Sequence, residues 1–538
     1  MTDIYRQRLE QLQSNEALPA INKIQRGIER EALRVNQDGL LSQLPHPDHL
    51  GSKLCHPAIT TDFSEAQPEL ITPVSTDIGA TLEFLSDIHR FTHSGLGDEI
   101  LWSASMPCML AGEDGIPLAQ YGSSNLGRLK TTYRNGLGNR YGRLMQTICA
   151  VHYNFSLPDD FWQLHWRLEG KRQPLKDYQS ARYFDLMRNF RRLSWLPIYL
   201  FGASPVVCNS FLKGRDHTLV PFDKGSLYAP YATSLRNGNL GYQSDTQSTS
   251  MQVSYGSLNE YIQTLALAIT TQNSVYEQIG TKSGSEYLQV NTSILQAEAE
   301  FYTTIRAKRV PPPGTNFLKI LRDDGVDYVE VRLLDVNPYV PLGIDAEEIY
   351  FLDVFLLYCL LAGSPLHDDD LCRSVNSNVR KTVYSGRDPD LLLDNVDRQL
   401  SIKEWGGQVL TQMTPIAALL DRANNTDVYT RNLQDQCSII DDPDQTLSAR
   451  ILADMKTEGI PYFRFAMNKA IEHSSYFKSQ SLPTGKQQQF ELAAEKSRQD
   501  QVKIERADTV DFDSYLAAIA LEYEALLDHK DPPSTAAR

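Results

Sequence analysis

The feature that most constrains the fold is a set of short segments in which polar side chains recur at every second residue. Residues 27–31 (GIERE) carry two carboxylates in this spacing, and polar and apolar residues alternate in 151–157 (VHYNFSL) and 328–334 (YVEVRLL). Successive side chains of a strand point to opposite faces of a sheet, so this alternation predicts strands with one polar face. Helical segments between them, such as 81–90 (TLEFLSDIHR), indicate an α+β protein.

Each predicted strand places its ionisable groups on one of its two sides. If residues 27–35 form a strand, Glu29 and Glu31 share a side with Leu33 and Val35; His152 lies on the polar side of the second strand, and Glu330 with Arg332 on that of the third. A fourth segment, 61–73 (TDFSEAQPELITP), adds Asp62, Glu65 and Glu69. Proline has no N–H for a ladder hydrogen bond, so a strand in this segment is expected to begin at Pro68.

Carboxylates gathered on one sheet face require cations. Two carboxylates ~5 Å apart repel by roughly 3 kcal/mol at an effective dielectric constant of about 20. Oxygen ligands with a single His and no thiolate favour Mg²⁺ or Mn²⁺ over zinc and copper. Magnesium commonly acts through phosphate oxygens, so the pattern indicates a nucleoside triphosphate substrate.

Each segment also has a simpler interpretation. Residues 27–31 are compatible with a solvated charge run on a helix, His152 with a structural histidine, and Glu330 with an ion pair to Arg332 on the same strand face. All of these interpretations would have to hold together to remove the predicted metal site.

Basic residues concentrate in one stretch of an otherwise acidic chain. Residues 126–143 contain Arg128, Lys130, Arg134, Arg140 and Arg143, whereas the net charge of the whole chain is −15. Arginine binds carboxylates and phosphates bidentately, so the stretch is a candidate for binding anionic substrates, with a solvated surface as the alternative. Neither GxGxxG nor GxxxxGK[ST] occurs. The acidic balance argues against nucleic acid or an anionic membrane as partner.

The organisation of the chain is predicted as follows. Residues 1–365 form the strand-bearing catalytic core, and 366–538 a mostly helical part packed on it, with a disordered tail. Residues 258–280 are expected to form one long helix, and 350–361 a buried core helix that is shorter than the ~20 residues of a membrane span. No apolar signal segment is visible, and the seven cysteines contain no CxxC, which favours a cytoplasmic protein. We expect a monomer.

Eight strings of the chain are specific enough to indicate a family: QRGIEREALRVN, TTDFSEAQPELITPV, SMPC, LAQYGSSNLGRLKTTYRNGL, RYGRLMQTICAVHYNFSLP, YLFGASP, YATSLRNGNLGY and YVEVRLLDVNPYVPLGI. In this order and spacing they resemble glutamate–cysteine ligase of the proteobacterial type. The resemblance runs from about residue 20 to about 365 and thins to patches such as TLSARI (446–451) beyond that point.

The resemblance implies a fold, a reaction and cofactors. The fold would be related to the catalytic part of glutamine synthetase, with a curved, mainly antiparallel sheet that forms a funnel-shaped active site and with helices packed outside. The reaction would join the γ-carboxylate of L-glutamate to the amine of L-cysteine, through a γ-glutamyl phosphate made from ATP, in the first step of glutathione synthesis. Mg²⁺, or Mn²⁺, would be the metal, and the partners would be small-molecule substrates.

Carried over residue by residue, the resemblance also implies the site. The metal ligands would be Glu29, Glu31, Asp62, Glu69, His152 and Glu330. Arg332 and Arg134 would act on the phosphoryl group and the substrate carboxylate, together with Arg236. The cysteine pocket would contain Tyr133, Gln146, Tyr242 and Tyr302, with core packing as the alternative role for any one of the 26 tyrosines.

Two other functions compete with this one. A related ATP-dependent ligase would use glutamate with a different amine, and its ADP release would not depend on cysteine. A non-catalytic metal-binding protein would hold cations on the same carboxylates and would turn over no ATP.

Overall fold

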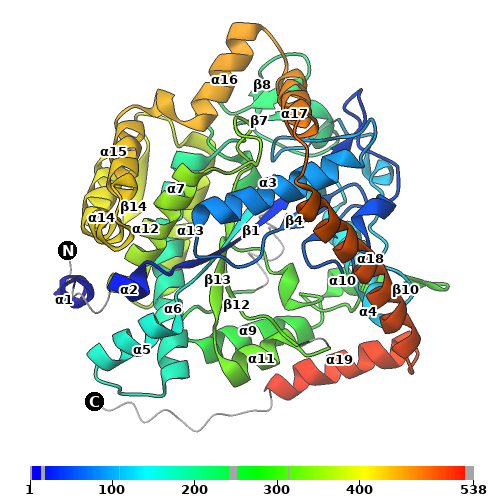
Figure 1. Ribbon diagram of the computed structural model, residues 1–538, viewed down its shortest axis with the longest axis horizontal. Helices are drawn as coiled ribbons and strands as arrows, with labels where there is room; N and C mark the ends of the chain where they lie inside the picture. Colours follow the sequence, from blue (N-terminus) through cyan, green and yellow to red (C-terminus); the bar gives the residue numbers. More distant parts are fainter. Residues whose placement is uncertain (1–2, 14–17, 108, 241–250, 313, 528–538) are drawn as a thin grey trace.

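The computed structural model describes residues 3–13, 18–107, 109–240, 251–312 and 314–527. At its centre lies a six-stranded antiparallel sheet surrounded by helices (Figure 1), which confirms the α+β class. In spatial order the strands are β12 (Ile305–Lys308), β13 (Tyr328–Leu334), β6 (Val151–Ser156), β1 (Gln25–Glu31), β4 (Pro68–Ile71) and β3 (Ile59–Thr61).

Three strands follow the predictions, a fourth follows them only in part, and β3 and β12 were not predicted. β6 and β13 form where the polar and apolar residues alternate, and β4 begins at Pro68, where the missing N–H costs no ladder hydrogen bond. The prediction of one strand over 27–35 was wrong beyond Glu31. Residues Arg34–Val35 form β2, which pairs with β5 (Ile100–Leu101) in a separate sheet, and the buried Arg34 donates to Glu99 at 2.6 Å.

The face of the sheet opposite the carboxylates is part of the hydrophobic core. Ile28, Tyr153 and Val331 are fully buried on it. Helix α3 (Ile78–Ser94) packs against β1 and β4, and α6 (Leu175–Leu193) packs against β12 and β13. These helices hold the central strands in a fixed position beneath the polar face.

Helix α12 (Ala346–Leu361) is the buried core helix that the sequence predicts. It is apolar on all sides and packs against several other helices, as expected for a helix inside a large core. Its one buried aspartate, Asp353, accepts hydrogen bonds from Arg26 Nε at 3.0 Å and from the Tyr153 hydroxyl at 2.7 Å. Burying a charge is tolerated because it is paired, and the pair ties β1 to the core.

The segment expected to be one long helix over 258–280 is two helices, so that prediction was wrong. Helix α9 (Leu258–Thr270) ends before Asn273, whose side chain accepts hydrogen bonds from Val275 N and Tyr276 N and so caps α10 (Ser274–Ile279). Asparagine competes with the helical backbone in this way, and it favours a new N-terminus over a continuous helix.

Further helices of the first part of the chain are α1 (Asp3–Leu12), α2 (Leu18–Ile21), α4 (Asn125–Tyr141), α5 (Asp159–Leu168), α7 (Trp195–Phe201) and α11 (Phe317–Asp324). Short sheets are formed by β7 (Val206–Cys208), β9 (Ser226–Tyr228) and β8 (Val220–Pro221), and by β10 (Lys282–Ser283) with β11 (Glu286–Tyr287). Among the described residues no helix is both long and apolar enough to cross a bilayer.

After residue 365 the described chain is mainly helical. It contains α13 (Asp369–Ser385), the hairpin β14 (Leu392–Asn395) and β15 (Arg398–Ser401), α14 (Ile402–Asn424), α15 (Val428–Asp441), α16 (Leu447–Glu458), α17 (Tyr462–Lys478), α18 (Thr484–Ala507) and α19 (Phe512–Leu527). These elements surround the sheet on several sides (Figure 1). The tail for which disorder is predicted lies outside the described residues.

Candidate active site

The pairing of the strands brings the predicted carboxylates together on one sheet face. In the antiparallel register Glu29 lies opposite His152, and Glu31 lies opposite Glu69. Glu330 on the next strand lies opposite Asn154, the neighbour of His152 on the same polar side. Residues directly opposite each other across an antiparallel pair have Cβ atoms about 5 Å apart, so the side chains form a continuous polar surface.

His152 is at the centre of this surface. Its Nδ1 is 3.3 Å from Glu29 Oε2 and 3.7 Å from Glu330 Oε1, and its Nε2 is 3.5 Å from Glu31 Oε1. Potential ligand atoms of Glu29, His152 and Glu330 all lie within 4.8 Å of one another. Asn154 donates to Glu29 Oε1 at 2.8 Å and fixes the orientation of that carboxylate.

The carboxyls of this surface differ in acidity. Burial raises the pKa of Glu31 and of Glu69, and neighbouring carboxylates raise both further. Burial acts in the same direction on Glu330, but Lys308 and Arg332 outweigh it and lower its pKa. Burial and the Arg332 charge lower the pKa of His152, which keeps the imidazole neutral and able to bind a metal.

Several atoms of the surface fit a divalent cation. Glu31 Oε1, His152 Nε2 and Glu330 Oε2 are buried and have no hydrogen-bond partner among the described residues. A buried polar atom without a partner costs free energy, which a bound cation would recover. A donor set of carboxylate oxygens with one imidazole is suited to Mg²⁺ or Mn²⁺.

Asp62 lies beside this surface, in the turn between β3 and β4. Its half-buried carboxylate is close enough to raise the pKa of both Glu31 and Glu69. The backbone carbonyl of Asp62 accepts a hydrogen bond from Arg134 Nε. The structure therefore brings all six predicted metal ligands to one region of the sheet.

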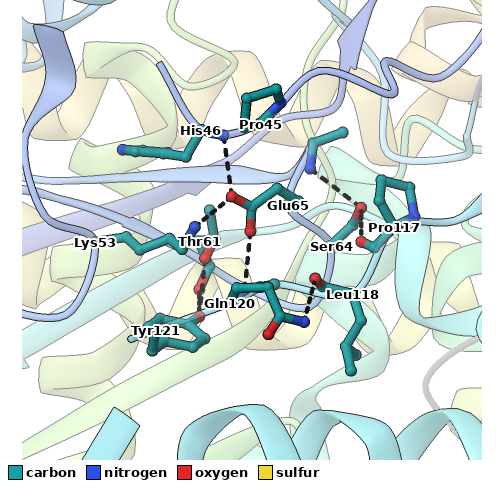
Figure 2. A network of polar contacts seen from close by, with 12 residues as sticks. Pro45, His46, Lys53, Thr61, Ser64, Glu65, Pro117, Leu118, Gln120 and Tyr121 are labelled. Carbon is teal, nitrogen blue, oxygen red and sulfur yellow. Dashed lines mark hydrogen bonds and ion pairs between the residues drawn. The ribbon is translucent and has the colours of Figure 1, made fainter. Parts of the chain in front are cut away.

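Glu65, from the same turn, does not join them. Figure 2 shows its carboxylate accepting hydrogen bonds from the backbone N–H groups of His46 at 3.0 Å and Gln120 at 2.9 Å, with Lys53 as its ion-pair partner. Its charge is already compensated within the loops, so Glu65 is a structural residue. The sequence alone adds it to the carboxylate group, because residues 62–67 have no regular periodicity from which its direction can be predicted.

The predicted cations lie at two ends of the surface. At the β12–β13 end, Arg332 Nη1 donates to Glu330 Oε1 at 3.0 Å, and Lys308 Nζ is 3.6 Å from Glu330 Oε2. The fully buried Arg236 donates to the Arg332 carbonyl at 2.6 Å. At the β3 end, Arg134 donates to the Asp62 and Thr61 carbonyls and stacks on Tyr121. Lys308 is not among the residues predicted from the sequence, although the alternation in 305–308 (IRAK) places it on the same side as Arg306.

The predicted cysteine-pocket residues are only partly assembled in the structure. Gln146 Nε2 donates to the Tyr302 hydroxyl at 3.1 Å, and the Tyr133 carbonyl accepts from Gln296 at 3.2 Å. Tyr302 also lines a cavity beside Arg332. Tyr242 lies outside the described residues.

That cavity has a volume of about 670 Å³, within the range of about 300–1,000 Å³ that small-molecule sites occupy. Thr303, Thr304 and Arg332 line its sheet side, and Val375 and Val379 of α13 provide apolar walls. The lining also includes three further arginines, Arg191, Arg373 and Arg380, and one aspartate, Asp369. The α13 residues could not be predicted from the sequence, because valines four residues apart on a polar helix also occur wherever a helix merely packs on a core.

An antiparallel sheet whose buried carboxylates and cations share one face, next to a cavity of nucleotide size, is typical of an enzyme that acts on anionic substrates. Comparison with known proteins identifies the family. The sequence profile of the glutamate–cysteine ligase family matches residues 9–382. The chain belongs to the glutamate–cysteine ligase family.

Individual relatives agree over nearly the whole chain. A glutamate–cysteine ligase of Alcanivorax borkumensis is 48% identical over 95% of this chain and 98% of its own, and one from Pseudomonas fluorescens is 45% identical over 96% and 97%. The crystal structure of the Francisella tularensis glutamate–cysteine ligase in complex with AMP superposes with a TM-score of 0.88 at 32% identity, covering 94% of this chain and 99% of that one.

Proposed function

We propose that the carboxylate surface of the six-stranded sheet is the site at which this chain carries out the reaction of its family. The chain is an ATP-dependent ligase that joins L-glutamate and L-cysteine to give γ-glutamylcysteine, the first step of glutathione synthesis. The observation that carries the site assignment is the group of buried ligand atoms around His152 that make no hydrogen bond among the described residues, with Arg332 beside it and the cavity next to Arg332.

Six residues would hold divalent cations, Mg²⁺ or Mn²⁺: Glu29, Glu31, Asp62, Glu69, His152 and Glu330. When bound, such cations neutralise the charge of triphosphate oxygens during phosphoryl transfer. The chain contributes the geometry. The sheet register sets the spacing of the carboxylates, and the hydrogen bond from Asn154 to Glu29 orients one of them.

The catalytic role proposed for Arg332 follows from its position. A carboxylate is a poor acyl donor, so the γ-carboxylate of glutamate is first phosphorylated, and the amine of cysteine then displaces phosphate from the γ-glutamyl phosphate. Arg332 lies between the carboxylate surface and the cavity, where its guanidinium can contact a transferring phosphoryl group. Arg236 donates to the Arg332 carbonyl and pairs with the buried Asp335, and from the sequence resemblance we propose that it also grips substrate carboxylate or phosphoryl oxygens.

Arg134 and the aromatic residues form the proposed amino-acid side of the site. Three of the five Arg134 N–H groups donate to backbone carbonyls, which fixes the guanidinium and leaves two N–H groups for a substrate carboxylate. Tyr133, Gln146 and Tyr302 provide a small, largely apolar lining suited to a thiol, and we include Tyr242 on the sequence resemblance alone.

The cavity beside Arg332 is the proposed nucleotide pocket. Its arginines suit phosphates, and its valines suit the flat apolar face of a base. We also propose that the sheet is curved into a funnel and that the fold is related to glutamine synthetase. Part of the structure of a bifunctional glutathione synthetase from Pasteurella multocida has a similar fold, with a TM-score of 0.65 at 24% identity over 87% of this chain and 53% of that one. The monomeric state and the cytoplasmic location stay predictions from the sequence.

Substitution of two proposed ligands tests the site. We expect Glu69→Gln and Glu330→Gln to remain folded and to lose ligase activity by about a hundredfold or more, because each removes an oxygen that a cation needs. The control is Glu83→Gln, which changes an exposed carboxylate of α3. Activity is measured as ADP release that requires both glutamate and cysteine, with circular dichroism as the folding check. Near wild-type rates in both variants would contradict the site.

The same assay separates the competing functions. Replacing cysteine by each other amino acid in turn should abolish ADP release, except with a close analogue such as 2-aminobutyrate. Release with an unrelated amine and none with cysteine would favour the related ligase. Metal binding without any turnover would favour the non-catalytic protein.

A further inference from the structure

The last two helices of the described chain form an arm that packs against helices of the first half of the chain. We define the C-terminal arm as residues 484–527, which comprise α18, α19 and the link between them. In Figure 1 the arm runs along the outside of the molecule, past α3 and α4, and then beside α9. It is attached early in its path, where Ser497 Oγ accepts from the backbone N–H of Ser52 at 2.9 Å.

The middle of the arm holds the N-terminus of α4. Glu505 Oε1 accepts from the backbone N–H of Ser123 at 3.0 Å, and Asp508 Oδ2 accepts from the backbone N–H of Asn125 at 2.5 Å. The first N–H groups of a helix have no partner within the helix, and this end carries the positive end of the helix dipole. Two carboxylates of the arm therefore accept hydrogen bonds from backbone N–H groups at the start of α4, and their negative charge is attracted to the positive end of its dipole. Arg128 of α4 stacks on Phe512, the first residue of α19, at 4.2 Å.

The end of the arm holds a second element near the site. The Tyr523 hydroxyl donates to Glu298 Oε2 at 2.6 Å. Glu298 belongs to the short helix Glu298–Glu300, which leads directly into Tyr302. Glu300 in turn accepts from Arg140 Nη1 at 2.9 Å and from the Tyr141 hydroxyl at 2.7 Å, both on α4. The arm, α4 and this segment thus form a closed ring of contacts.

We propose that the C-terminal arm positions the two walls of the amino-acid pocket. One wall is α4, which carries Tyr133 and Arg134, and the other is the segment that ends in Tyr302. Asp508 and Tyr523 are positioning residues that act on these walls from outside and touch no substrate. This role rests on the proposed function, because it assumes that the two walls bind the amino-acid substrates.

Two substitutions with matched controls test the role. Asp508→Ala removes the acceptor at the start of α4, and Tyr523→Phe removes only a hydroxyl. Asp500→Ala is the control for the first, because Asp500 pairs with Lys496 and Lys503 of its own helix. Tyr515→Phe is the control for the second, because Tyr515 belongs to the same helix and contacts Phe512 through its ring, which phenylalanine keeps.

The readout is the set of KM values for glutamate, cysteine and ATP. We expect each of the two variants to raise the KM of at least one amino acid by about fivefold, in the range of one lost helix-terminal hydrogen bond. In Asp508→Ala the KM for ATP should change less than about twofold, because among the described residues α4 contributes none to the lining of the proposed nucleotide pocket, whereas Tyr302 lines it. Asp508→Asn keeps an acceptor oxygen and should restore most of the wild-type KM. Both controls should match the wild type.

The outcomes separate the arm's role from the function on which it rests. Unchanged amino-acid KM values in both variants, whether or not the melting temperature falls, would overturn the positioning role, because a purely structural arm changes only the folded fraction. An equal rise in all three KM values in Asp508→Ala would overturn it as well. If the wild-type protein showed no cysteine-dependent ADP release, the proposed function would be refuted instead. In that case amide hydrogen exchange over residues 125–130 still tests whether Asp508 holds the start of α4. Faster exchange in Asp508→Ala supports this contact, and unchanged exchange refutes it.

Discussion

Replacing Glu31 by Gln should stabilise the metal-free protein and at the same time abolish its activity. Glu31 Oε2 accepts from the backbone N–H of Ala150 at 2.8 Å, but Oε1 has no hydrogen-bond partner among the described residues. The carboxylate also lies directly opposite Glu69, and like charges in opposed positions destabilise a sheet. An amide of the same shape keeps the bond from Ala150, and its NH₂ group can donate to His152 Nε2, which is 3.5 Å from Oε1.

The expected gain follows from the pKa of this carboxyl. Burial and the charge of Asp62 raise the pKa of Glu31 well above its ordinary value of 4.5. The folded state therefore binds the proton more tightly than the unfolded chain, and stability is lost as the pH rises above 4.5. The interval to pH 7 is about 2.5 units, which at about 1.4 kcal/mol per unit limits the gain to about 3 kcal/mol. We expect 1 to 3 kcal/mol at about pH 7 and almost none near pH 4.5.

Urea unfolding in the presence of EDTA measures this effect, with the free energy of unfolding followed from pH 4.5 to pH 8. Glu65→Gln is the matched control, because Glu65 is a buried carboxylate of the same region whose charge is compensated by Lys53 and two backbone N–H groups. Its replacement should destabilise the protein. Added Mg²⁺ should narrow the difference between Glu31→Gln and the wild type. If Glu31→Gln lowers the free energy of unfolding at pH 7 in EDTA, the carboxylate is well compensated without a cation and the reasoning is wrong.

Two further predictions concern the core. Arg26→Met should cost about 3–5 kcal/mol of unfolding free energy in urea, because it leaves Asp353 buried without its charge partner; a loss below 1 kcal/mol would show that the tyrosines around Asp353 suffice. The histidines His89, His93 and His473 are buried near Arg30, and burial lowers the pKa of His93 to about 3 and of His473 to about 4. Because the unfolded chain binds these protons first, stability should fall as the pH drops below 6.5, and His89→Met should reduce that fall by up to about 1.4 kcal/mol per pH unit. An unchanged pH slope would contradict the role of His89.

The polar face could be predicted from the sequence because strand geometry is local. In β13, alternation alone fixes that Glu330 and Arg332 share a side, and in β6 it fixes the side of His152. The same rule predicts that Arg30 points away from Glu29 and Glu31. The structure confirms this prediction, because Arg30 is buried on the core side and donates to the Trp102 carbonyl at 3.4 Å.

What could not be predicted depends on the path of the chain between elements. The sequence assigns Glu65 to the carboxylate group because it lies between Asp62 and Glu69, yet the turn directs its side chain to Lys53. The break between α9 and α10 depends on whether Asn273 caps a new helix or stays inside a longer one. Both results involve contacts with distant parts of the chain: Lys53 pairs with Glu65, and the backbone N–H of Asn273 donates to the Thr292 carbonyl at 2.9 Å. The resemblance, in contrast, does predict the family, which the comparisons confirm.

The strand order has a consequence for the synthesis of the protein. The neighbours β6 and β13 are distant in sequence, since β6 ends at Ser156 and β13 begins at Tyr328. At about 5–20 residues per second, the nascent chain has to wait roughly 10 to 35 s before the free edge of β6 can be paired. Through that interval the unpaired edge of β6, a strand whose apolar face carries Tyr153 and Phe155, is available to other chains on the same messenger. Chaperone binding to the growing chain should therefore concentrate between the emergence of β6 and that of β13.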